Sequence, residues 1–346
     1  MKKVYVGLSG GVDSSVTAAL LKEQGYDVTG VYMKNWSKDL PGFVCPWKED
    51  FQDAKRVAVQ LDIPFKMYDF ETQYKQKVVD YMVAEYKAGR TPNPDVMCNQ
   101  EVKFKLFLDT ALKDGADMIA TGHYASVEDG RLQKAKDDNK DQTYFLYRIT
   151  HKALTKTLFP LGGYTKPEVR VLAKKFGLVT ANKKESMGIC FVGKVGIREF
   201  LMNELGAQQP GDILDGSGMT VGRHDGAIFY TIGQRHGLDV GGGLPYYVTG
   251  KNMKKNEVYV TTDIDDANLW HKEFKIADMH WINGAPVEGM ALEVRTRHRS
   301  NLIKCEIQHT TLGYEVFLKD EIRALMPGQS AVLYDGNHVL GGGIII

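Results

Sequence analysis

A glycine-rich loop between a short apolar strand and a helix constrains the fold of this chain more than any other feature. Val4–Leu8 is an apolar run, and Ser9–Ser15 reads Ser-Gly-Gly-Val-Asp-Ser-Ser. A helix is predicted from Asp13 to Gln24, with Gly25 as its stop. Glycines let a backbone approach a phosphate closely, and a helix N-terminus offers free N–H groups at the positive end of its dipole. The pattern therefore predicts an anion-binding loop between a buried strand and a helix.

The first half of the chain alternates apolar strands with amphipathic helices. Further runs of strand length lie at Val28–Met33, Phe65–Asp69 and Met118–Thr121. Apolar residues keep helical spacing over 51–61, 74–86 and 169–176. The capping box Thr165-x-x-Glu168 precedes the last of these helices. Repeated strand–helix alternation predicts an α/β domain, a doubly wound parallel sheet with helices on both faces.

From about Gln209 onward, short β-branched or aromatic runs alternate with glycine and asparagine turns. Strands are expected at Ile228–Ile232, Tyr246–Thr249, Val258–Thr262, Ala291–Arg297, Leu302–Gln308, Tyr314–Leu318 and Ala331–Tyr334. Strands at this spacing without long helices predict two small, mostly antiparallel β domains. The stretch Trp270–Ala277 has no strong pattern and serves as a boundary, so the expected domains are 1–205, 206–273 and 274–346.

Composition narrows the class of protein. The 346 residues are 43% hydrophobic and 25% charged, which excludes a disordered or low-complexity chain. The formal net charge is +1, so any contact with nucleic acid must come from local basic patches. The four cysteines contain no Cys-x-x-Cys pair, and no metal site is expected. The chain opens on a core strand and lacks an apolar run of the roughly 20 residues that cross a bilayer, which predicts a cytoplasmic protein without membrane contact.

The glycine-rich loop departs from two common phosphate-binding motifs. It lacks the Gly-Lys-Ser/Thr of a Walker A loop and so has no phosphate-reaching lysine, and its glycines do not have Gly-x-Gly-x-x-Gly spacing. Ser-Gly-Gly-x-Asp-Ser instead resembles the PP-loop of the adenylating ATP pyrophosphatases, which implies a grip on the pyrophosphate of ATP. Asp13 is then expected to orient Mg²⁺ or the loop amides. A plain glycine turn into a helix is the alternative.

Two cysteines lie in loops with unusual neighbours. Cys98 ends the run Arg-Thr-Pro-Asn-Pro-Asp-Val-Met-Cys, just before a predicted helix whose dipole would stabilise a thiolate. Cys190 lies in the turn Gly-Ile-Cys-Phe-Val-Gly. Two such cysteines suggest sulfur transfer, in which one thiol carries the sulfur as a persulfide and the other resolves the disulfide that forms. The alternative, a small buried hydrophobe, is favoured for Cys45 and Cys305.

Nine sequence blocks carry a close resemblance to a known family. In order, they are SGGVDSS, AEYKAGRTPNPDVMCN, VKFK, ATGHYA, KDQTYFLY, LGGYTKPEVR, GICFVG, YTIGQRHGL and PGQSAVLYDG. Together they resemble the bacterial tRNA-specific 2-thiouridylases, the MnmA/TrmU family, over nearly the whole length. The resemblance implies a PP-loop domain, a small central β domain and a C-terminal β-barrel.

The resemblance also implies a mechanism. ATP would adenylate the C2 oxygen of the wobble uridine, so that AMP becomes the leaving group. A persulfide on Cys190 would deliver sulfur to C2, and Cys98 would be the nucleophile that attacks the persulfide, leaving a transient Cys98–Cys190 disulfide. Asp95, within one turn of Cys98, is the candidate general acid or base, with a helix N-cap as the equal alternative.

Further site residues follow from the resemblance. The residues implied to bind ATP are Gly7, Leu8, Ser9, Gly10, Gly11, Val12, Asp13, Ser14, Met33 and Gly122. The residues implied to contact the target base or the tRNA are Asn93, Pro94, Asp95, His123, Lys140, Asp141, Gln142, Arg297, His298 and Gln329. A core methionine at 33 and a tight turn with a solvated histidine at 122–123 are the alternatives. The implied ligands are ATP, Mg²⁺ and the anticodon arm of tRNAs for Lys, Glu and Gln. A cysteine desulfurase or sulfur-relay protein would donate the persulfide.

An arginine run supplies a candidate basic patch for RNA. If Arg295–Arg299 continues a strand, its three arginines share one face and could line up along phosphates. A solvated sheet face is the alternative. Such contacts predict a tRNA affinity that falls steeply with added salt.

The chain departs from the family pattern just before its second loop cysteine. Glu185 and Met187 stand where the family usually has Asp and Thr in an Asp-Ser-Thr-Gly-Ile-Cys block. Three other functions stay open: an amidating ligase with the same loop, a non-catalytic tRNA-binding protein, and an enzyme with a [4Fe–4S] cluster on Cys98, Cys190 and Asp95.

Overall fold

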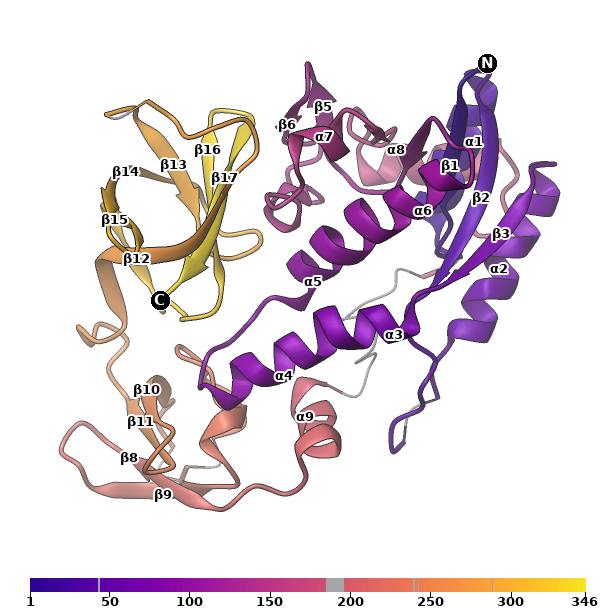
Figure 1. Ribbon diagram of the computed structural model, residues 1–346. Coiled ribbons are helices and arrows are strands. Elements are labelled where there is room, and N and C mark those ends of the chain that lie inside the picture. Colours follow the sequence, from indigo (N-terminus) through magenta and orange to yellow (C-terminus); the bar gives the residue numbers. More distant parts are fainter. Residues whose placement is uncertain (43, 185–195, 239, 242, 288) are drawn as a thin grey trace.

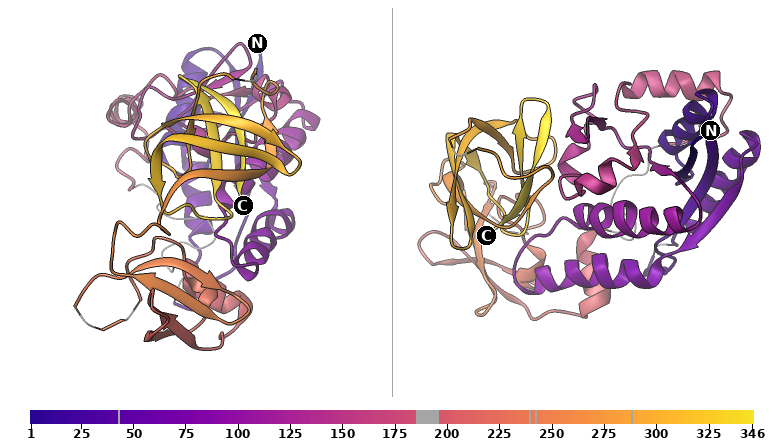
Figure 2. Two further views of the ribbon diagram at one scale, coloured as in Figure 1. Left: turned by 90° about the vertical axis from the view of Figure 1, so that its left-hand side faces the viewer. Right: turned by 45° about the horizontal axis from the view of Figure 1, so that its top comes forward.

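The described residues form three β-sheets that follow one another along the chain, each with its own hydrophobic core (Figure 1). The computed structural model describes residues 1–346 apart from 43, 185–195, 239, 242 and 288. Figure 2 shows the barrel and the small central sheet lying to one side of the larger N-terminal part.

The N-terminal sheet is parallel and places the glycine-rich loop at its centre. Its strands are β1 (Lys3–Gly7), β2 (Asp27–Lys34), β3 (Phe65–Asp69), β4 (Met118–Ala120) and β7 (Thr157–Leu158). Their order is β3-β2-β1-β4-β7, so the chain fills one side of β1 first and then crosses to the other. Crevices for ligands form outside the carboxyl ends of strands where the order reverses in this way. The loop after β1 lies at that point.

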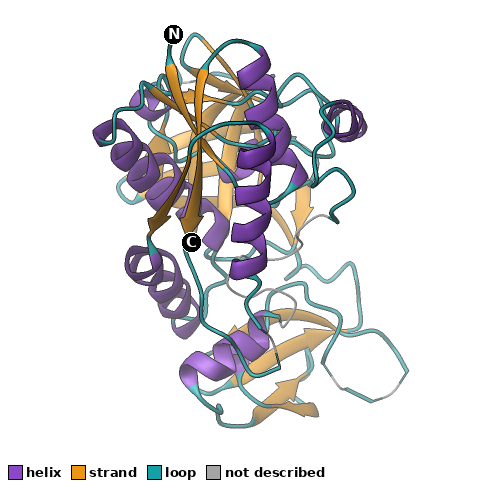
Figure 3. Cartoon of the chain, turned by 90° about the vertical axis from the view of Figure 1, so that its right-hand side faces the viewer, coloured by secondary structure: helices purple, strands orange, loops and turns teal. Residues whose placement is uncertain are grey.

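Helices cover both faces of this sheet (Figure 3). The α- and π-helical elements described in the N-terminal part of the chain are α1 (Val12–Glu23), α2 (Trp47–Gln60), α3 (Glu71–Tyr74), η1 (Lys75–Val79), α4 (Asp80–Lys87), α5 (Pro94–Met97), η2 (Cys98–Phe107), α6 (Leu108–Lys113), α7 (His151–Leu154), α8 (Lys166–Lys175) and α9 (Ile197–Leu205), of which α7 and α9 lie away from the sheet (Figure 1). Val4 and Val6 pack with α1 and α2, whereas Tyr5 faces the helices that follow β3. The predicted doubly wound α/β domain is confirmed.

Two long helices lie side by side on one face of the sheet (Figure 1). The first runs through α3, η1 and α4, and the second through α5, η2 and α6. Both contain a π-helical stretch, a rare geometry that is frequent near functional sites. Val78 and Met82 of the first helix share one core with Phe104 and Phe107 of the second.

The central sheet is small and mixed. Its strands are β8 (Gly211–Leu214), β9 (Thr220–His224), β10 (Tyr247–Asn252) and β11 (Glu257–Thr261). Only the β8–β11 pairing is parallel among the pairings of this sheet in the described residues. The predicted strand at Ile228–Ile232 is wrong, because Ala227–Phe229 forms a 3₁₀ turn, η4. Ala227 and Ile228 are apolar because this turn is buried, and the sequence alone did not distinguish a buried turn from a strand.

The C-terminal sheet closes into a barrel. Its strands are β12 (Trp270–Trp281), β13 (Leu292–Arg295), β14 (Ile303–Thr310), β15 (Gly313–Arg323), β16 (Ser330–Asp335) and β17 (His338–Ile345). Strand β12 pairs with both β15 and β17, which closes the ring. The stretch expected to be a pattern-poor boundary at Trp270–Ala277 is therefore the start of the longest strand among the described residues. The prediction of two small, mostly antiparallel β domains is confirmed.

A hairpin from the first half of the chain extends the barrel sheet. Strands β5 (Ser126–Glu128) and β6 (Arg131–Gln133) join it through a bridge between Gln133 and His338 of β17. Figure 1 shows this hairpin facing the barrel. The last short helical turn, η3 (Thr143–Phe145), follows in the same segment. No helix among the described residues has the length and apolar character that a membrane crossing requires.

Candidate active site

The glycine-rich loop turns sharply into α1. Gly10 has φ +74, and a Cβ there would collide with the carbonyl oxygen of Asp50 in α2, so this position requires glycine. The Ser14 hydroxyl accepts a hydrogen bond from the Ser9 amide at 3.2 Å and donates to the Gly11 carbonyl at 3.1 Å. Gly11 caps α1 without a side-chain hydrogen bond. The loop therefore presents a helix N-terminus that no capping side chain covers, which suits an anion.

Asp13 in the first turn of α1 is held by a lysine from a distant helix. Lys166 is the first residue of α8, and its Nζ donates to Asp13 Oδ1 at 2.7 Å and to Oδ2 at 2.8 Å. The Tyr124 hydroxyl donates to Oδ1 at 3.0 Å. The predicted capping box of Thr165 and Glu168 is confirmed and fixes the start of α8. In this arrangement Asp13 positions Lys166, which lies in the LGGYTKPEVR block but was not predicted from the sequence as a site residue.

A pocket of about 290 Å³ opens beside the loop. Its lining comes from four parts of the chain: Ser9, Gly11, Val12, Asp13, Tyr124, Lys140, Gln142, Lys166, Lys184, His298 and Arg299. Among the lining residues that the structure describes, three lysines and an arginine face one carboxylate, and that carboxylate is already paired with Lys166. The pocket is therefore suited to a polyanion such as a polyphosphate.

Two further predicted ATP residues lie close to the loop. A Cβ on Gly122 would lie 2.8 Å from the Ser14 amide nitrogen, which places the Gly122 turn directly against the start of α1. Met33, near the end of β2, lies against Gly7 at the carboxyl end of β1. Both positions are at the edge of the sheet where the loop lies.

Cys98 lies inside a helix rather than before one. Asn93 caps α5, and its side chain accepts a hydrogen bond from the Val96 amide at 3.4 Å. The helix then continues through η2, so Cys98 is one turn in, and its side chain is buried. Phe107 of the same helix reaches Gly7, nine residues after Cys98. Cys98 therefore lies roughly 13 Å from Phe107, toward the start of the helix, and so beyond the carboxyl edge of the sheet.

Asp95 is not the helix cap, because Asn93 fills that role. Its side chain is accessible to solvent, yet the surrounding protein desolvates the carboxyl and raises its pKa, and the positive charge of Lys103 opposes that shift. A carboxyl with a raised pKa is suited to proton transfer.

His123 is neutral and packed against aromatic rings. Desolvation lowers the pKa of His123 well below its usual range, and Lys103 lowers it further. Its Nε2 lies 3.4 Å from Lys103 Nζ, and its Nδ1 lies 2.8 Å from Thr121 Oγ1. These partners assign the proton to Nδ1, which donates to Thr121, while Nε2 accepts from the lysine. The alternative of a solvated histidine is therefore wrong.

The barrel domain contacts the loop that leads to Cys98. The Gln329 side-chain amide donates to the carbonyl oxygens of Thr91 at 2.8 Å and Pro92 at 3.1 Å. The Thr91 amide in turn donates to the Pro327 carbonyl at 2.8 Å. Gln329 is predicted to contact tRNA, and in the structure its side chain fixes the backbone of the two residues that precede Asn93.

The predicted arginine stripe is wrong, because β13 ends at Arg295 and the next residues form a turn. The Arg295 side chain points inward and pairs with Asp141 at 3.3 Å. Asp141 is buried and also accepts from the Thr143 hydroxyl at 2.8 Å, so its carboxylate is used within the protein. Arg297 is exposed, whereas His298 packs on Phe145 with ring centroids 4.5 Å apart.

Cys190 lies outside the described residues, as do Glu185 and Met187, so its predicted pairing with Cys98 stays a prediction. The chain that leads toward it is anchored beside the glycine-rich loop. Lys183 Nζ contacts Asp50 at 2.9 Å and Asp53 at 2.6 Å, and Arg170 donates to the Lys183 carbonyl at 2.8 Å. Lys184 lines the loop pocket itself.

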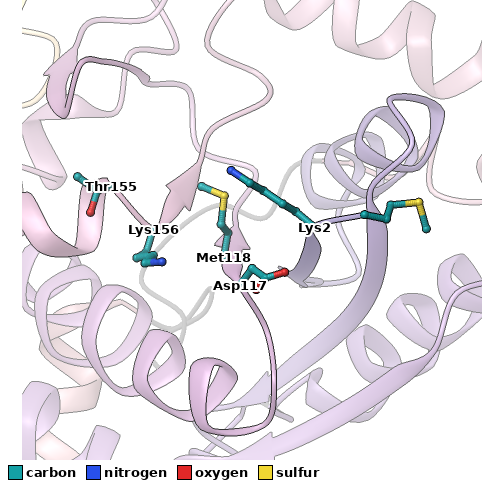
Figure 4. A pocket seen from close by; sticks show the side chains of 6 residues that line it. Lys2, Asp117, Met118, Thr155 and Lys156 are labelled. Carbon is teal, nitrogen blue, oxygen red and sulfur yellow. The ribbon is translucent and has the colours of Figure 1, made fainter.

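A second pocket, of about 340 Å³, lies at the opposite edge of the sheet (Figure 4). Lys2, Asp117, Met118 and Lys156 line it at the amino ends of β1, β4 and β7. It lies away from the glycine-rich loop, so it is not the candidate site. In the described parts of the chain, no cluster of three or more His, Cys, Asp or Glu side chains could hold a metal ion.

A central parallel sheet with a Ser-Gly-Gly-x-Asp-Ser loop at its switch point defines a PP-loop nucleotide-binding protein, here joined to two β modules. Three family models match: a tRNA methyl transferase HUP domain over 2–194, a tRNA methyl transferase PRC-barrel domain over 198–262, and an aminomethyltransferase beta-barrel domain over 271–345. Similarity to curated proteins then shows the family. The chain belongs to the tRNA-specific 2-thiouridylases.

Relatives match the chain over almost its whole length. It is 46% identical over 351 residues to the tRNA-specific 2-thiouridylase MnmA of Bacillus subtilis (strain 168), which covers 99% of this chain and 94% of the relative. It is 48% identical over 350 residues to the protein of the same name from Bacillus thuringiensis (strain Al Hakam), with the same coverage.

Solved structures resemble the chain more weakly. A 4-thiouridine synthetase–RNA complex with bound ATP has 18% identity and a TM-score of 0.39, covering 59% of this chain and 50% of that chain. The NMN synthetase from Francisella tularensis has 17% identity and a TM-score of 0.36, covering 58% and 72%. At these TM-scores the likeness carries no functional argument.

Proposed function

We propose that the chain is a tRNA-uridine 2-sulfurtransferase that spends ATP to replace the C2 oxygen of the wobble uridine with sulfur. The C2 oxygen attacks the α-phosphate of ATP and releases pyrophosphate, which turns the oxygen into part of an AMP leaving group. Sulfur from a persulfide on Cys190 then attacks C2, and AMP departs. The Cys98 thiolate then attacks Sγ of Cys190, which breaks the S–S bond of the former persulfide, leaves its terminal sulfur on C2 and forms a Cys98–Cys190 disulfide that an external thiol reduces.

The observation that carries this proposal is the cationic pocket beside the glycine-rich loop. Lys140, Lys166 and Lys184 line it together with the start of α1, so a triphosphate would meet both backbone amides and ammonium groups. Lys184 is also six positions before Cys190, so the persulfide-bearing stretch starts from the wall of the same pocket.

The proposed ATP contacts fit the residues present. The backbone of Gly7–Ser14 would bind the pyrophosphate, with Met33 and Gly122 at the adenosine end. Mg²⁺ would neutralise the phosphate charge, as it does in most ATP sites, with phosphates supplying most of its ligands. Asp13 faces the pocket but is paired with Lys166, so a role as a magnesium ligand would require that pair to open.

The residues proposed to contact tRNA lie at the start of the helix that carries Cys98, near the glycine-rich loop, and in the turn that follows β13 of the barrel. Asn93, Pro94 and Asp95 would meet the unstacked target base, and Asp95 would move the proton. His123 and Gln142 lie near the loop, and Lys140, Arg297 and His298 are proposed to bind the anticodon arm. Proposed partners are tRNAs for Lys, Glu and Gln and a cysteine desulfurase or sulfur-relay protein. The proposed compartment is the cytoplasm, where those tRNAs occur.

Nucleoside mass spectrometry tests the proposal. Undermodified tRNA is incubated with the protein, ATP, Mg²⁺ and a sulfide or persulfide donor. We expect 2-thiouridine together with equal amounts of pyrophosphate and AMP. Cys98→Ser and Cys190→Ser should each reduce the persulfide-dependent product to background. Cys305→Ala is the matched control, because Cys305 is buried in the barrel and desolvation raises its pKa to about 12.

The same assay separates the competing functions. An amidating ligase would need ammonia and would keep full turnover without either loop thiol. A tRNA-binding protein without activity would release no pyrophosphate. A methyltransferase, as two of the family models are named, would give a methylated nucleoside and would not consume ATP. Colourless aerobic protein with full activity would exclude the [4Fe–4S] alternative.

A further inference from the structure

One wall of the nucleotide pocket comes from the opposite end of the chain. His298 and Arg299, in the turn after β13 of the barrel, line the pocket together with Ser9 and Asp13 of the glycine-rich loop. The pocket is therefore incomplete without the C-terminal domain.

Contacts behind the turn hold it at the pocket. Arg295 pairs with buried Asp141, and the His298 ring packs against Phe145 with centroids 4.5 Å apart. Asp141 lies between Lys140 and Gln142, which line the same pocket. The turn and this wall of the pocket are thus fixed to one another.

The backbone at Arg299 is in a conformation that usually requires glycine. Arg299 has φ +65, and the Ser300 amide donates to the Arg297 carbonyl at 3.1 Å to close the turn. No carboxylate pairs with Arg299 among the residues that the structure describes. An arginine in a disfavoured conformation, without an ion pair in the described part of the chain, points to a ligand as the reason for its presence.

The charges of the pocket indicate which ligand. Arg299 joins Lys140, Lys166 and Lys184 around a space in which Asp13, the one acidic lining residue in the described part of the chain, is already paired. A guanidinium presents two parallel N–H groups that match a phosphate, and its charge persists at any pH of interest. We propose that Arg299 binds the polyphosphate of ATP, so that the barrel domain completes the nucleotide site. This rests on the proposed ATP-dependent function.

The test is ATP binding measured by calorimetry without tRNA. Arg299→Gly removes the guanidinium and the disfavoured backbone conformation together, so the melting temperature should stay the same or rise. ATP affinity should fall about tenfold, the size of effect for one charged hydrogen-bonding group. Arg299→Lys keeps the charge and should lose less. Arg131→Ala, at an exposed arginine of β6 outside this pocket, should bind ATP like the unmodified chain.

The calorimetry has three possible outcomes, and each one supports or overturns the proposed role of Arg299. If the unmodified chain binds ATP and Arg299→Gly binds it equally well, Arg299 is not a nucleotide residue, whatever happens to tRNA affinity. If the unmodified chain does not bind ATP, the proposed function fails as well. A weakened ATP affinity with an unchanged or raised melting temperature supports the proposal, because loss of a merely structural residue would lower the melting temperature instead.

Discussion

At the scale of single residues, one ion pair lies at the centre of the cationic pocket beside the glycine-rich loop. Lys166 is nearly buried, with 11% of its side chain exposed, and its ammonium group donates to both oxygens of the Asp13 carboxylate. A Walker A loop carries its lysine within the loop, whereas Lys166 comes from α8, a helix far along the chain. The loop motif and the α8 capping box therefore belong to one site.

Lys166→Met tests this pair. Removing one partner of a poorly solvated ion pair leaves the Asp13 charge without its main counter-ion, which should cost about 1–2 kcal/mol of stability. Turnover in a single-turnover thiolation assay should fall at least about tenfold, because a cation is lost from the phosphate site. Lys175→Ala is the matched control, because Lys175 lies on the same helix and its ion pair with Glu23 is exposed at the surface. Equal activity of the two variants would show that Lys166 is dispensable.

At the scale of elements, the helix that carries Cys98 is set by its first turn. Pro94 at the first helical position and Asn93 at the cap start the helix, and burial of Val96 fixes its rotation. The proline and asparagine were evident in the sequence, whereas the placement of Cys98 one turn inside the helix was not. Helix boundaries depend on which residue caps, and Asn93 and Asp95 were both acceptable caps by type.

Substitutions at Asn93 separate capping from recognition of the base. Asn93→Ala should lower the free energy of unfolding by about 1 kcal/mol because the Val96 amide loses its acceptor. Asn93→Asp keeps a capping oxygen and should retain stability in chemical denaturation. If Asn93 also contacts the target base, Asn93→Asp will lose turnover while remaining stable. Full activity of Asn93→Asp would restrict the residue to the cap.

The sequence pattern did not predict β17 of the barrel, and the structure shows why. β17 contains Gly341–Gly343, and glycine runs disfavour strands when they are judged locally. In the barrel these glycines pass close to neighbouring backbones: a Cβ on Gly342 would collide with the Ala331 carbonyl oxygen. The strand therefore forms because its neighbours β12 and β16 supply hydrogen bonds at close range.

At the scale of the whole molecule, burial of histidines makes folding sensitive to acid. Desolvation lowers the pKa values of five histidines, namely His123, His224, His271, His280 and His298. For His298 the pKa falls to about 4, because Arg299 and Arg295 add to the effect of desolvation. The unfolded chain therefore binds more protons than the folded protein once the pH falls below about 6.5.

The free energy of unfolding should consequently be largest above pH 6.5 and should decline as the pH drops from 7 to 5. Each histidine contributes a slope of at most about 1.4 kcal/mol per pH unit over this window. Denaturant titrations of the unmodified chain and of His298→Asn measure the slope, and the variant should show a shallower decline. A stability that rises toward pH 5, or a variant with an unchanged slope, would contradict the histidine explanation.

Local features of the sequence determined much of this protein. Strand–helix alternation, the glycine-rich loop after β1 and the capping box of α8 depend on residues within a few positions of one another, so the sequence alone predicted them. Only tertiary structure decided that Lys166 meets Asp13, that Arg295 turns inward to Asp141, and that Arg299 lines the pocket beside the glycine-rich loop. Those partners are distant in the chain, and their pairing depends on how the sheet, helices and barrel pack, which local pattern does not encode.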